Sequence, residues 1–242
     1  MYIYMAMRLD KLLAHHGIGT RKEVKSYIRK GYVSVNDVVI KKDDFKVDYE
    51  KDVIRFDDEI IIYRPYVYIM LNKPAGYVSA TKDNVHPTVV DLIHGYEQYE
   101  LFPVGRLDID TEGLLILTND GDFAHKLLAP SRHHSKLYYA YVDGIMNEDD
   151  VVAFKQGIVI DNHLCQSSNL TVLKTDDNHS EVHIEIYEGK FHQVKRMVEN
   201  VGKKVEYLKR IQIKNLKLDD SLELGEYREL SDAELFDLMD QL

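Results

Sequence analysis

The hydrophobic positions at the start of the chain follow two helical stretches and then short strands. Residues 8–17 place three leucines on one helical face and end in a glycine. Residues 20–31 begin with Thr and Glu in capping-box spacing and also end in a glycine. Residues 32–40 and 53–63 alternate apolar and polar side chains, which indicates short strands. We therefore expect a small helix-helix-hairpin domain at residues 1–64.

Strand and helix patterns interleave over the rest of the chain, which begins at Pro65. Strands are expected on both sides of the turn at 73–76 and at 114–117, 135–144, 170–174, 181–187, 205–213 and 226–230. Helices are expected after Thr88, over 121–129 before Pro130, after Asn147, and over 188–202. Because hairpins join many of the strands, the pattern predicts an α+β domain with a mixed, mainly antiparallel sheet over residues 65–242.

Composition narrows the class of protein. At 242 residues with 45% apolar side chains, the chain is long enough to build a substantial core. The single cysteine, Cys165, excludes a disulfide framework and leaves too little sulfur for a structural zinc site. The eleven histidines show no HExxH spacing, so we predict no metal site. No apolar run is long enough for a membrane span and no signal peptide is recognisable, so we expect a cytoplasmic protein.

Charge is distributed unevenly along the chain, whose net charge is -10. Residues 1–48 contain ten Lys and Arg against six Asp and Glu, whereas the remainder is strongly acidic. This asymmetry indicates a basic module that approaches a polyanion. The basic side chains expected to bind RNA there are Arg8, Arg21, Lys22, Lys25, Arg29 and Lys30.

The stretch GRLDIDTEGLLILTNDG, residues 105–121, carries Asp108, Asp110 and Glu112 at alternate positions directly before an apolar strand. It matches the first half of a calcium-binding EF-hand loop, but Asn119 stands where the bidentate Glu is needed, so calcium is disfavoured. Two interpretations stay open from the residues alone. The acids form a solvated turn, or one of them lies at the mouth of a cleft as a nucleophile or general acid/base.

Three segments of the larger domain decide between these interpretations: LNKPAGYVS, GRLDIDTEGLLILTNDG and EGKFHQVKRM. They follow a basic unit that resembles the S4 RNA-binding domain, and together they resemble the ribosomal RNA pseudouridine synthases, in the branch that modifies 16S (small-subunit) RNA. The resemblance implies an S4 domain at residues 1–64 and a pseudouridine synthase catalytic domain at residues 65–242. It also implies isomerisation of a uridine already in RNA, without cofactor or metal.

The resemblance implies roles for individual residues. Asp108 matches the nucleophile, and Lys195 matches the cation that pairs with it and keeps it ionised. Adjacent helical residues point about 100° apart, so Arg196 is expected to be a weaker candidate for that pairing or a phosphate contact. Tyr138 matches the strand tyrosine that packs against the target base. Further RNA contacts are expected from Lys73 and Arg106.

The rest of the central motif is expected to support the nucleophile. Asp110 and Glu112 shape the loop or hydrogen-bond the neighbouring Arg106 and Thr111. Gly105 and Gly113 give the backbone freedom where a flipped nucleotide comes close.

Two alternatives to this function stay open. The same reaction on a large-subunit (23S) uridine would use the same residues, because catalytic residues do not encode the target. A non-catalytic S4-type RNA-binding or ribosome-assembly protein would need the basic module but not Asp108, Tyr138 and Lys195. The expected partner is ribosomal RNA of the small subunit or its assembly intermediate, with no membrane contact, and the protein is expected to be a monomer.

Overall fold

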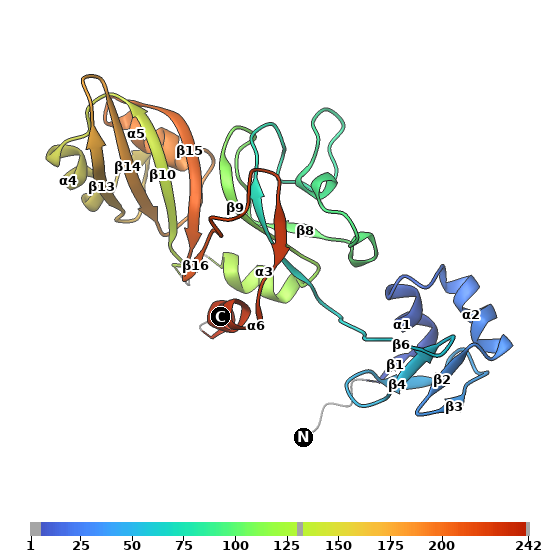
Figure 1. Ribbon diagram of the computed structural model, residues 1–242. Coiled ribbons are helices and arrows are strands. Elements are labelled where there is room, and N and C mark those ends of the chain that lie inside the picture. Colours follow the sequence, from blue (N-terminus) through green and yellow to red (C-terminus); the bar gives the residue numbers. More distant parts are fainter. Residues whose placement is uncertain (1–5, 130–132, 241–242) are drawn as a thin grey trace. The chain divides into compact units, whose positions relative to one another are not determined.

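The chain forms two compact units in the computed structural model, which describes residues 6–129 and 133–240. The smaller unit holds the described residues up to Tyr66 together with Tyr96–Glu100. The larger unit holds Val67–Gly95 and the described residues from Leu101 onward. The boundary expected before Pro65 lies beside this division, and Figure 1 shows the elements of each unit.

The smaller unit combines two helices with short antiparallel strands in its described residues. The helices are α1 (Leu9–His15) and α2 (Arg21–Lys30), and a short 3-10 helix is η2 (Glu97–Tyr99). The strands are β1 (Ala6–Arg8), β2 (Val33–Val35), β3 (Val38–Val39), β4 (Lys46–Asp48), β5 (Ile54–Phe56) and β6 (Glu59–Ile60). One sheet has the order β3-β2-β5-β6, and β1 pairs with β4.

The ends of α2 lie where the sequence predicts them. Thr20 and Glu23 form a reciprocal capping box, and Gly31 ends the helix with a φ of 86°, a left-handed conformation that favours glycine. Apolar side chains from both helices pack on the strands in one buried cluster: Leu9, Leu12, Leu13, Val24, Ile28, Val33, Val35, Val47 and Ile54. The predicted helix-helix-hairpin arrangement is confirmed.

The larger unit is built on a nine-stranded sheet. Its strands are β7 (Tyr68–Lys73), β8 (Phe102–Val104), β9 (Glu112–Thr118), β10 (Lys136–Asp143), β13 (Asn169–Thr175), β14 (His179–Ile186), β15 (Lys204–Ile213), β16 (Leu216–Lys217) and β17 (Tyr227–Glu229). The main order is β13-β14-β10-β15-β9-β7-β17, with β16 beside β15 and β8 beside β9. Only β15 and β9 pair in parallel among the described strands, so the predicted mixed, mainly antiparallel sheet is confirmed.

Helices cover parts of this sheet (Figure 1). They are α3 (Gly121–Leu128), α4 (Glu148–Gln156), α5 (Gln193–Asn200) and α6 (Asp232–Met239), with the 3-10 helix η1 (Val89–Leu92). The helix α5 contacts β15 and a small hairpin of β11 (Val159–Ile160) and β12 (His163–Leu164), while α4 contacts β13. Near the other end of the sheet, α3 and α6 bury Phe123, Leu127 and Leu238 against strand side chains such as Leu114 and Ile116.

Apart from the short strands β8, β11, β12 and β16, which were not expected, two larger features of this unit differ from the sequence prediction. The second strand expected after Gly76 is reduced to a single bridge between Val78 and Thr88. In its place, the Ser79 hydroxyl donates to the carbonyl of Leu107 at 2.9 Å and accepts from the Leu107 N–H at 3.0 Å. These bonds tie this segment to the loop before β9 and take the place of a strand ladder. Pro130, expected to end a helix, lies outside the described residues.

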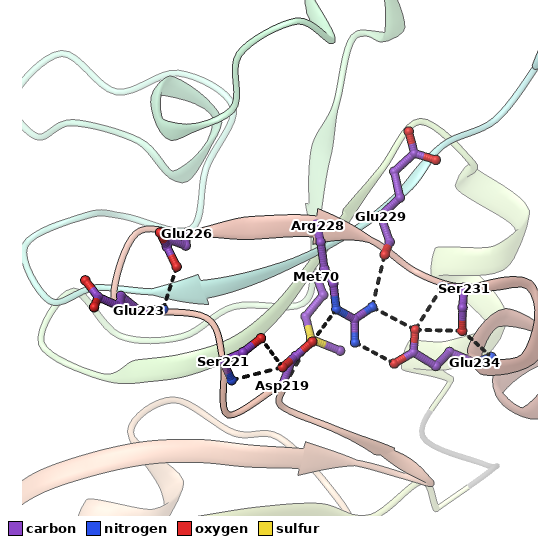
Figure 2. Close-up of polar contacts among 9 residues, drawn as sticks. All are labelled: Met70, Asp219, Ser221, Glu223, Glu226, Arg228, Glu229, Ser231 and Glu234. Carbon is purple, nitrogen blue, oxygen red and sulfur yellow. Dashed lines mark hydrogen bonds and ion pairs between the residues drawn. The ribbon is translucent and has the colours of Figure 1, made fainter.

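The second difference is the helix α6, which the sequence analysis did not predict. Figure 2 shows how it is attached: the guanidinium of Arg228, on β17, lies between two carboxylates. Its Nε donates to Asp219 at 2.6 Å, and its two terminal nitrogens donate to Glu234, in the first turn of α6, at 2.8 Å each. Ser231 caps the helix by accepting from the backbone N–H of Glu234. A bidentate pair of this kind fixes the helix to the edge strand.

Candidate active site

Asp108 lies in the loop between β8 and β9, with a quarter of its side chain exposed. The loop is fixed by the ammonium of Lys73, the last residue of β7. That group donates to the carbonyl oxygens of Asp108 at 3.1 Å, Thr111 at 2.8 Å and Pro74 at 3.0 Å. One buried cation therefore holds the backbone at the candidate nucleophile and directly after it.

Lys73 is wholly buried, at 0% exposure, so the phosphate contact expected of it is wrong. Burial lowers the pKa of Lys73 to about 8, against the opposing effect of the acids at positions 108, 110 and 112. The sequence placed this lysine in a turn, where lysines usually face solvent. It lies at the end of a strand that is buried from Ile69 onward, and this position turns it inward.

The expected ion pair between Asp108 and Lys195 is present. Nζ of Lys195, in the first turn of α5, lies 3.2 Å from Oδ2 of Asp108 and 2.6 Å from Oδ1 of Asp110. Burial raises the pKa of Asp110, but the hydrogen bond and the positive charge of Lys195, together with smaller contributions, outweigh it and leave that pKa below its ordinary value. The pKa of Lys195 is raised: burial opposes this, and both carboxylates favour the charged form.

His192 is a second basic group at Asp108 that the sequence analysis missed. Its Nε2 lies 3.6 Å from Oδ1 of Asp108. It is the N-cap residue of α5 and has a φ of 50°, the left-handed region that few non-glycine residues adopt. The first turn of α5 thus presents Lys195, His192 and the positive end of the helix dipole to one carboxylate. The available signal was the motif HQVKR, in which His192 stands three residues before Lys195, a spacing that brings two side chains to one side of a helix.

Tyr138 occupies the buried face of β10, with 7% exposure, as its position opposite Tyr139 in the strand alternation implies. It pairs across the sheet with Arg210 on β15, and Arg210 pairs in turn with Gly113 on β9. At about 4.8 Å between strands, the backbones of Tyr138 and Gly113 lie roughly 10 Å apart. Tyr138 therefore lies in the same cross-strand row of the sheet as Gly113 of β9. The strand β9 directly follows the loop that carries Asp108.

Arg210 is buried in this row, with 3% exposure. Its Nε donates to the carbonyl of Leu114 at 2.8 Å, and one terminal nitrogen has no hydrogen-bond partner among the described residues. Gly113 lies so close to this strand that a Cβ there would collide with the backbone of Arg210. The close approach of β9 and β15 therefore requires a glycine at position 113. The reason expected from the sequence was different, namely the approach of a nucleotide.

The remaining acids of the motif have partners that were not expected. Asp110 shares Lys195 with Asp108, and Glu112 accepts a hydrogen bond from the hydroxyl of Tyr207 at 2.7 Å. Asp110 and Glu112 make these long-range contacts instead of the expected hydrogen bonds to Arg106 and Thr111. No local sequence pattern encodes contacts of this kind.

The other predicted RNA-binding residues of this unit lie at its surface. Arg196 pairs with Asp161, and the hydrogen bond to that carboxylate raises the pKa of Arg196. Arg106 is exposed in the loop before Asp108. Phosphate contacts for Arg106 and Arg196 stay a prediction.

In the smaller unit, three of the predicted RNA-binding cations converge on one acid. Asp10 is 0% exposed, and its carboxylate lies 3.0 Å from Arg8, 3.2 Å from Arg21 and 3.8 Å from Lys25. Burial raises the pKa of Asp10, but the hydrogen bonds and positive charges of Arg8 and Arg21 together outweigh it and leave that pKa below its ordinary value. The other three predicted cations, Lys22, Arg29 and Lys30, are all exposed. Arg29 pairs with Asp43 at 2.6 Å.

No group of three or more His, Cys, Asp or Glu side chains in residues 6–129 and 133–240 is arranged to hold a metal ion. Within the same ranges, no helix combines the length and apolar character that crossing a bilayer requires.

Comparison with known families matches both units. The family RNA pseudouridylate synthase matches residues 67–200, and the S4 domain matches residues 7–54. Asp108, Tyr138 and Lys195 lie in the first range, and the cations around Asp10 lie in the second.

Individual proteins are similar along nearly the whole chain. A protein of Bacillus subtilis (strain 168) described as an uncharacterized RNA pseudouridine synthase is 42% identical over 95% of this chain and 97% of its own. A ribosomal small subunit pseudouridine synthase A of Vibrio vulnificus (strain CMCP6) is 37% identical over 95% and 98%. A crystal structure of a pseudouridylate synthase superposes with a TM-score of 0.67 at 35% identity, over 96% of this chain and all of the other.

Proposed function

Because this chain belongs to the RNA pseudouridylate synthase family, we propose that it converts a uridine of small-subunit (16S) ribosomal RNA into pseudouridine with Asp108 as the nucleophile. Family membership accounts for the isomerisation of uridine in RNA. The small-subunit substrate is supported by the relatives of that name, such as the 37% identical one whose sequence aligns over almost its full length. The roles of the individual residues rest on the geometry of the site.

The observation that carries the proposal is the ion pair of Asp108 with Lys195 at 3.2 Å. The reaction breaks the N1–C1′ bond, turns the uracil and makes a C5–C1′ bond, and an ionised carboxylate serves each of its possible routes. Asp108 attacks the sugar carbon, attacks the base, or assists formation of a glycal. In each route Lys195 favours the charged carboxylate, and the positive end of α5 acts in the same direction.

A uridine in folded RNA must leave its stack to reach Asp108. Tyr138 supplies an aromatic ring on the buried face of β10, two strands from β9, and a ring packed against the flipped uracil offsets roughly 1–3 kcal/mol of lost stacking. Its hydroxyl is a candidate for proton transfer at C5. Lys73 holds the loop of Asp108 in place through backbone carbonyls, and is thus a positioning residue.

The S4 domain delivers the RNA in this proposal. The carboxylates of Asp108 and Asp110 share one ammonium, so their cluster with Lys195 is negative overall and does not attract a phosphate backbone by itself. The exposed cations of α2, Lys22, Arg29 and Lys30, provide that attraction. We further propose that the protein acts as a monomer in the cytoplasm, where ribosomes are assembled.

The experiment that tests this function is a map of pseudouridine across both ribosomal RNAs from cells with and without the gene. We expect one small-subunit uridine to lose its modification, and the gene carrying Asp108→Asn to fail to restore it. A lost site in the large-subunit RNA would move the substrate to that particle. Restoration by Asp108→Asn would remove Asp108 from the nucleophile's role.

A further inference from the structure

Beside the site, Phe191 and His192 form a stack that the mechanism does not use. Their ring centroids lie 3.7 Å apart with an interplanar angle of 20°. His192 meets Asp108 through Nε2 at 3.6 Å, while Phe191 is 74% exposed. One face of the Phe191 ring is covered by the imidazole, and most of the rest of its surface is open to solvent.

The turn that carries this stack is held rigidly. Gln193, 4% exposed, accepts from the backbone N–H of Lys190 through Oε1 at 2.9 Å and donates to Glu188 through Nε2 at 3.0 Å. His192 adopts a left-handed conformation with a φ of 50°, which a histidine keeps only where its surroundings impose it. Phe191 is therefore an exposed ring whose backbone is fixed next to the candidate nucleophile.

Single exposed apolar side chains are common and need no explanation by themselves. The position of this one is informative, because removal of a uridine from its stack exposes the faces of the neighbouring bases. A base on the outer face of Phe191 would continue the Phe191–His192 stack. That base would be separated from His192 by the phenyl ring, so it is not the base that reacts at Asp108.

We propose that Phe191 is a stacking platform for a nucleobase that neighbours the target uridine in the RNA strand. The inference rests on the proposed isomerisation at Asp108 and adds a residue that recognises the substrate. Tyr138 then packs on the base that reacts, and Phe191 on a base beside it. Because stacking releases no counterions, Phe191 should contribute to affinity without contributing to its salt dependence.

The test is a double-mutant cycle between the protein and the RNA. The substrate is a synthetic RNA fragment around the uridine that the pseudouridine map identifies, either intact or with an abasic residue on one side of the target. The enzymes are wild type, Phe191→Leu and Phe191→Trp. The control is Phe236→Leu, which alters another exposed phenylalanine, on α6 with 67% exposure.

With the intact RNA, we expect Phe191→Leu to lower kcat/KM by about 5- to 150-fold, as for one stacked base, with the salt slope of binding unchanged. Phe191→Trp should restore most of the loss, and Phe236→Leu should behave as wild type. At one of the two neighbouring positions, an abasic residue should lower kcat/KM of the wild-type enzyme by the same factor as Phe191→Leu does on intact RNA. With Phe191→Leu, the same abasic residue should cause no further loss of kcat/KM.

Three results would overturn the platform. In the first, Phe191→Leu keeps the wild-type kcat/KM. In the second, the losses of kcat/KM from Phe191→Leu and from the abasic residue add in full at both positions. In the third, Phe191→Trp does not restore the kcat/KM that Phe191→Leu loses. Full additivity would mean that Phe191 only holds His192 against Asp108. Failure of the wild-type enzyme on every ribosomal uridine would instead contradict the proposed function, and it is seen before any variant is made.

Discussion

Lys195 on α5 and Asp108 in the loop before β9 form an ion pair of 3.2 Å between segments far apart in the sequence. The same ammonium lies 2.6 Å from Asp110, so one cation serves two acids. Removal of Lys195 would leave two neighbouring carboxylates without their shared cation. This arrangement makes Lys195 the residue on which the charge state of the site depends most.

Lys195→Met should therefore lower kcat by about tenfold or more while changing RNA affinity little, because a partly buried ion pair loses its cation. Arg196→Met is the matched variant: it removes the next residue of the helix, whose guanidinium pairs with Asp161. It should leave kcat near wild type and weaken binding if it contacts phosphate. Single-turnover rates and binding titrations on the two variants check this, and the opposite assignment would mean that the two bases are exchanged.

Lys73→Met should impair both the loop and the fold. Its ammonium donates to carbonyls of Pro74, Asp108 and Thr111, and methionine would leave these buried groups without a donor. We expect the free energy of unfolding to fall by about 1–3 kcal/mol. We also expect kcat to fall by up to about a hundredfold, because Asp108 loses its position.

Denaturant unfolding and single-turnover kinetics at a temperature where the variant is folded separate the two effects. Lys82→Met, at an exposed lysine, is the control and should change neither quantity. Full activity of folded Lys73→Met would show that the loop keeps its shape without the buried cation.

Asp10→Asn tests how the S4 domain holds its cations. The change removes a negative charge, so charge alone predicts tighter RNA binding. Since Asp10 contacts Arg8, Arg21 and Lys25, we expect looser binding instead, by about tenfold, as for one lost charge-assisted hydrogen bond.

The control for this variant is Asp43→Asn, which removes the same charge at an acid that pairs with Arg29. It should bind RNA as tightly as wild type or more tightly. Binding titrations at several salt concentrations, beside thermal unfolding, give the answer. Unchanged affinity of Asp10→Asn with a lower Tm would mean that the cluster only stabilises the domain.

The Arg228 network makes the attachment of α6 sensitive to acid. The hydrogen bond from Arg228 lowers the pKa of Glu234 to about 2, and Ser221 with Arg228 lowers the pKa of Asp219 to about 2. Both values are depressed from about 4 in the unfolded chain, so their stabilisation is complete above that pH and is lost as the pH falls toward 2.

The Tm difference between wild type and Arg228→Met should therefore be largest at neutral pH and should narrow between about pH 4 and pH 2. Thermal unfolding followed across that range measures it. A difference that stays constant down to pH 2 would mean that the carboxylates are not coupled to Arg228.

Local signals in the sequence predicted local structure well. The capping box of Thr20 and Glu23 and the glycine that ends α2 lie as expected, because neighbours in the chain determine them. The helix α6 was missed although Ser231 and Glu234 have the same spacing, because its apolar residues do not follow one helical face: Leu238 is buried, while Phe236 and Met239 are exposed. The strand expected after Gly76 does not form, because the hydrogen bonds of Ser79 to a distant loop take the place of the backbone hydrogen bonds between strands.

The site was predictable only where a motif carries the residue. The ion pair of Asp108 with Lys195 followed from a family resemblance and is present. Three other features of the site arise where segments far apart in sequence meet. They are the burial of Lys73, the contact of His192 with Asp108, and the sharing of Lys195 with Asp110. Periodicity and spacing describe neighbours along a chain, so they contain no signal for the burial of Lys73 or for the sharing of Lys195. For His192, the motif HQVKR offered a signal.

The most direct test of the central claim compares Asp108→Asn with Asp110→Asn in a single-turnover assay on the mapped RNA fragment. Both changes are isosteric and remove one carboxylate from Lys195, so they alter the ion-pair cluster to a similar degree. We expect Asp108→Asn to bind RNA normally and to form no pseudouridine above background, since enzymes supply at least roughly a millionfold acceleration. Asp110→Asn should keep most of the wild-type rate. Turnover by Asp108→Asn at even a tenth of the wild-type rate, or abolition by Asp110→Asn alone, would contradict the assignment of Asp108 as the nucleophile.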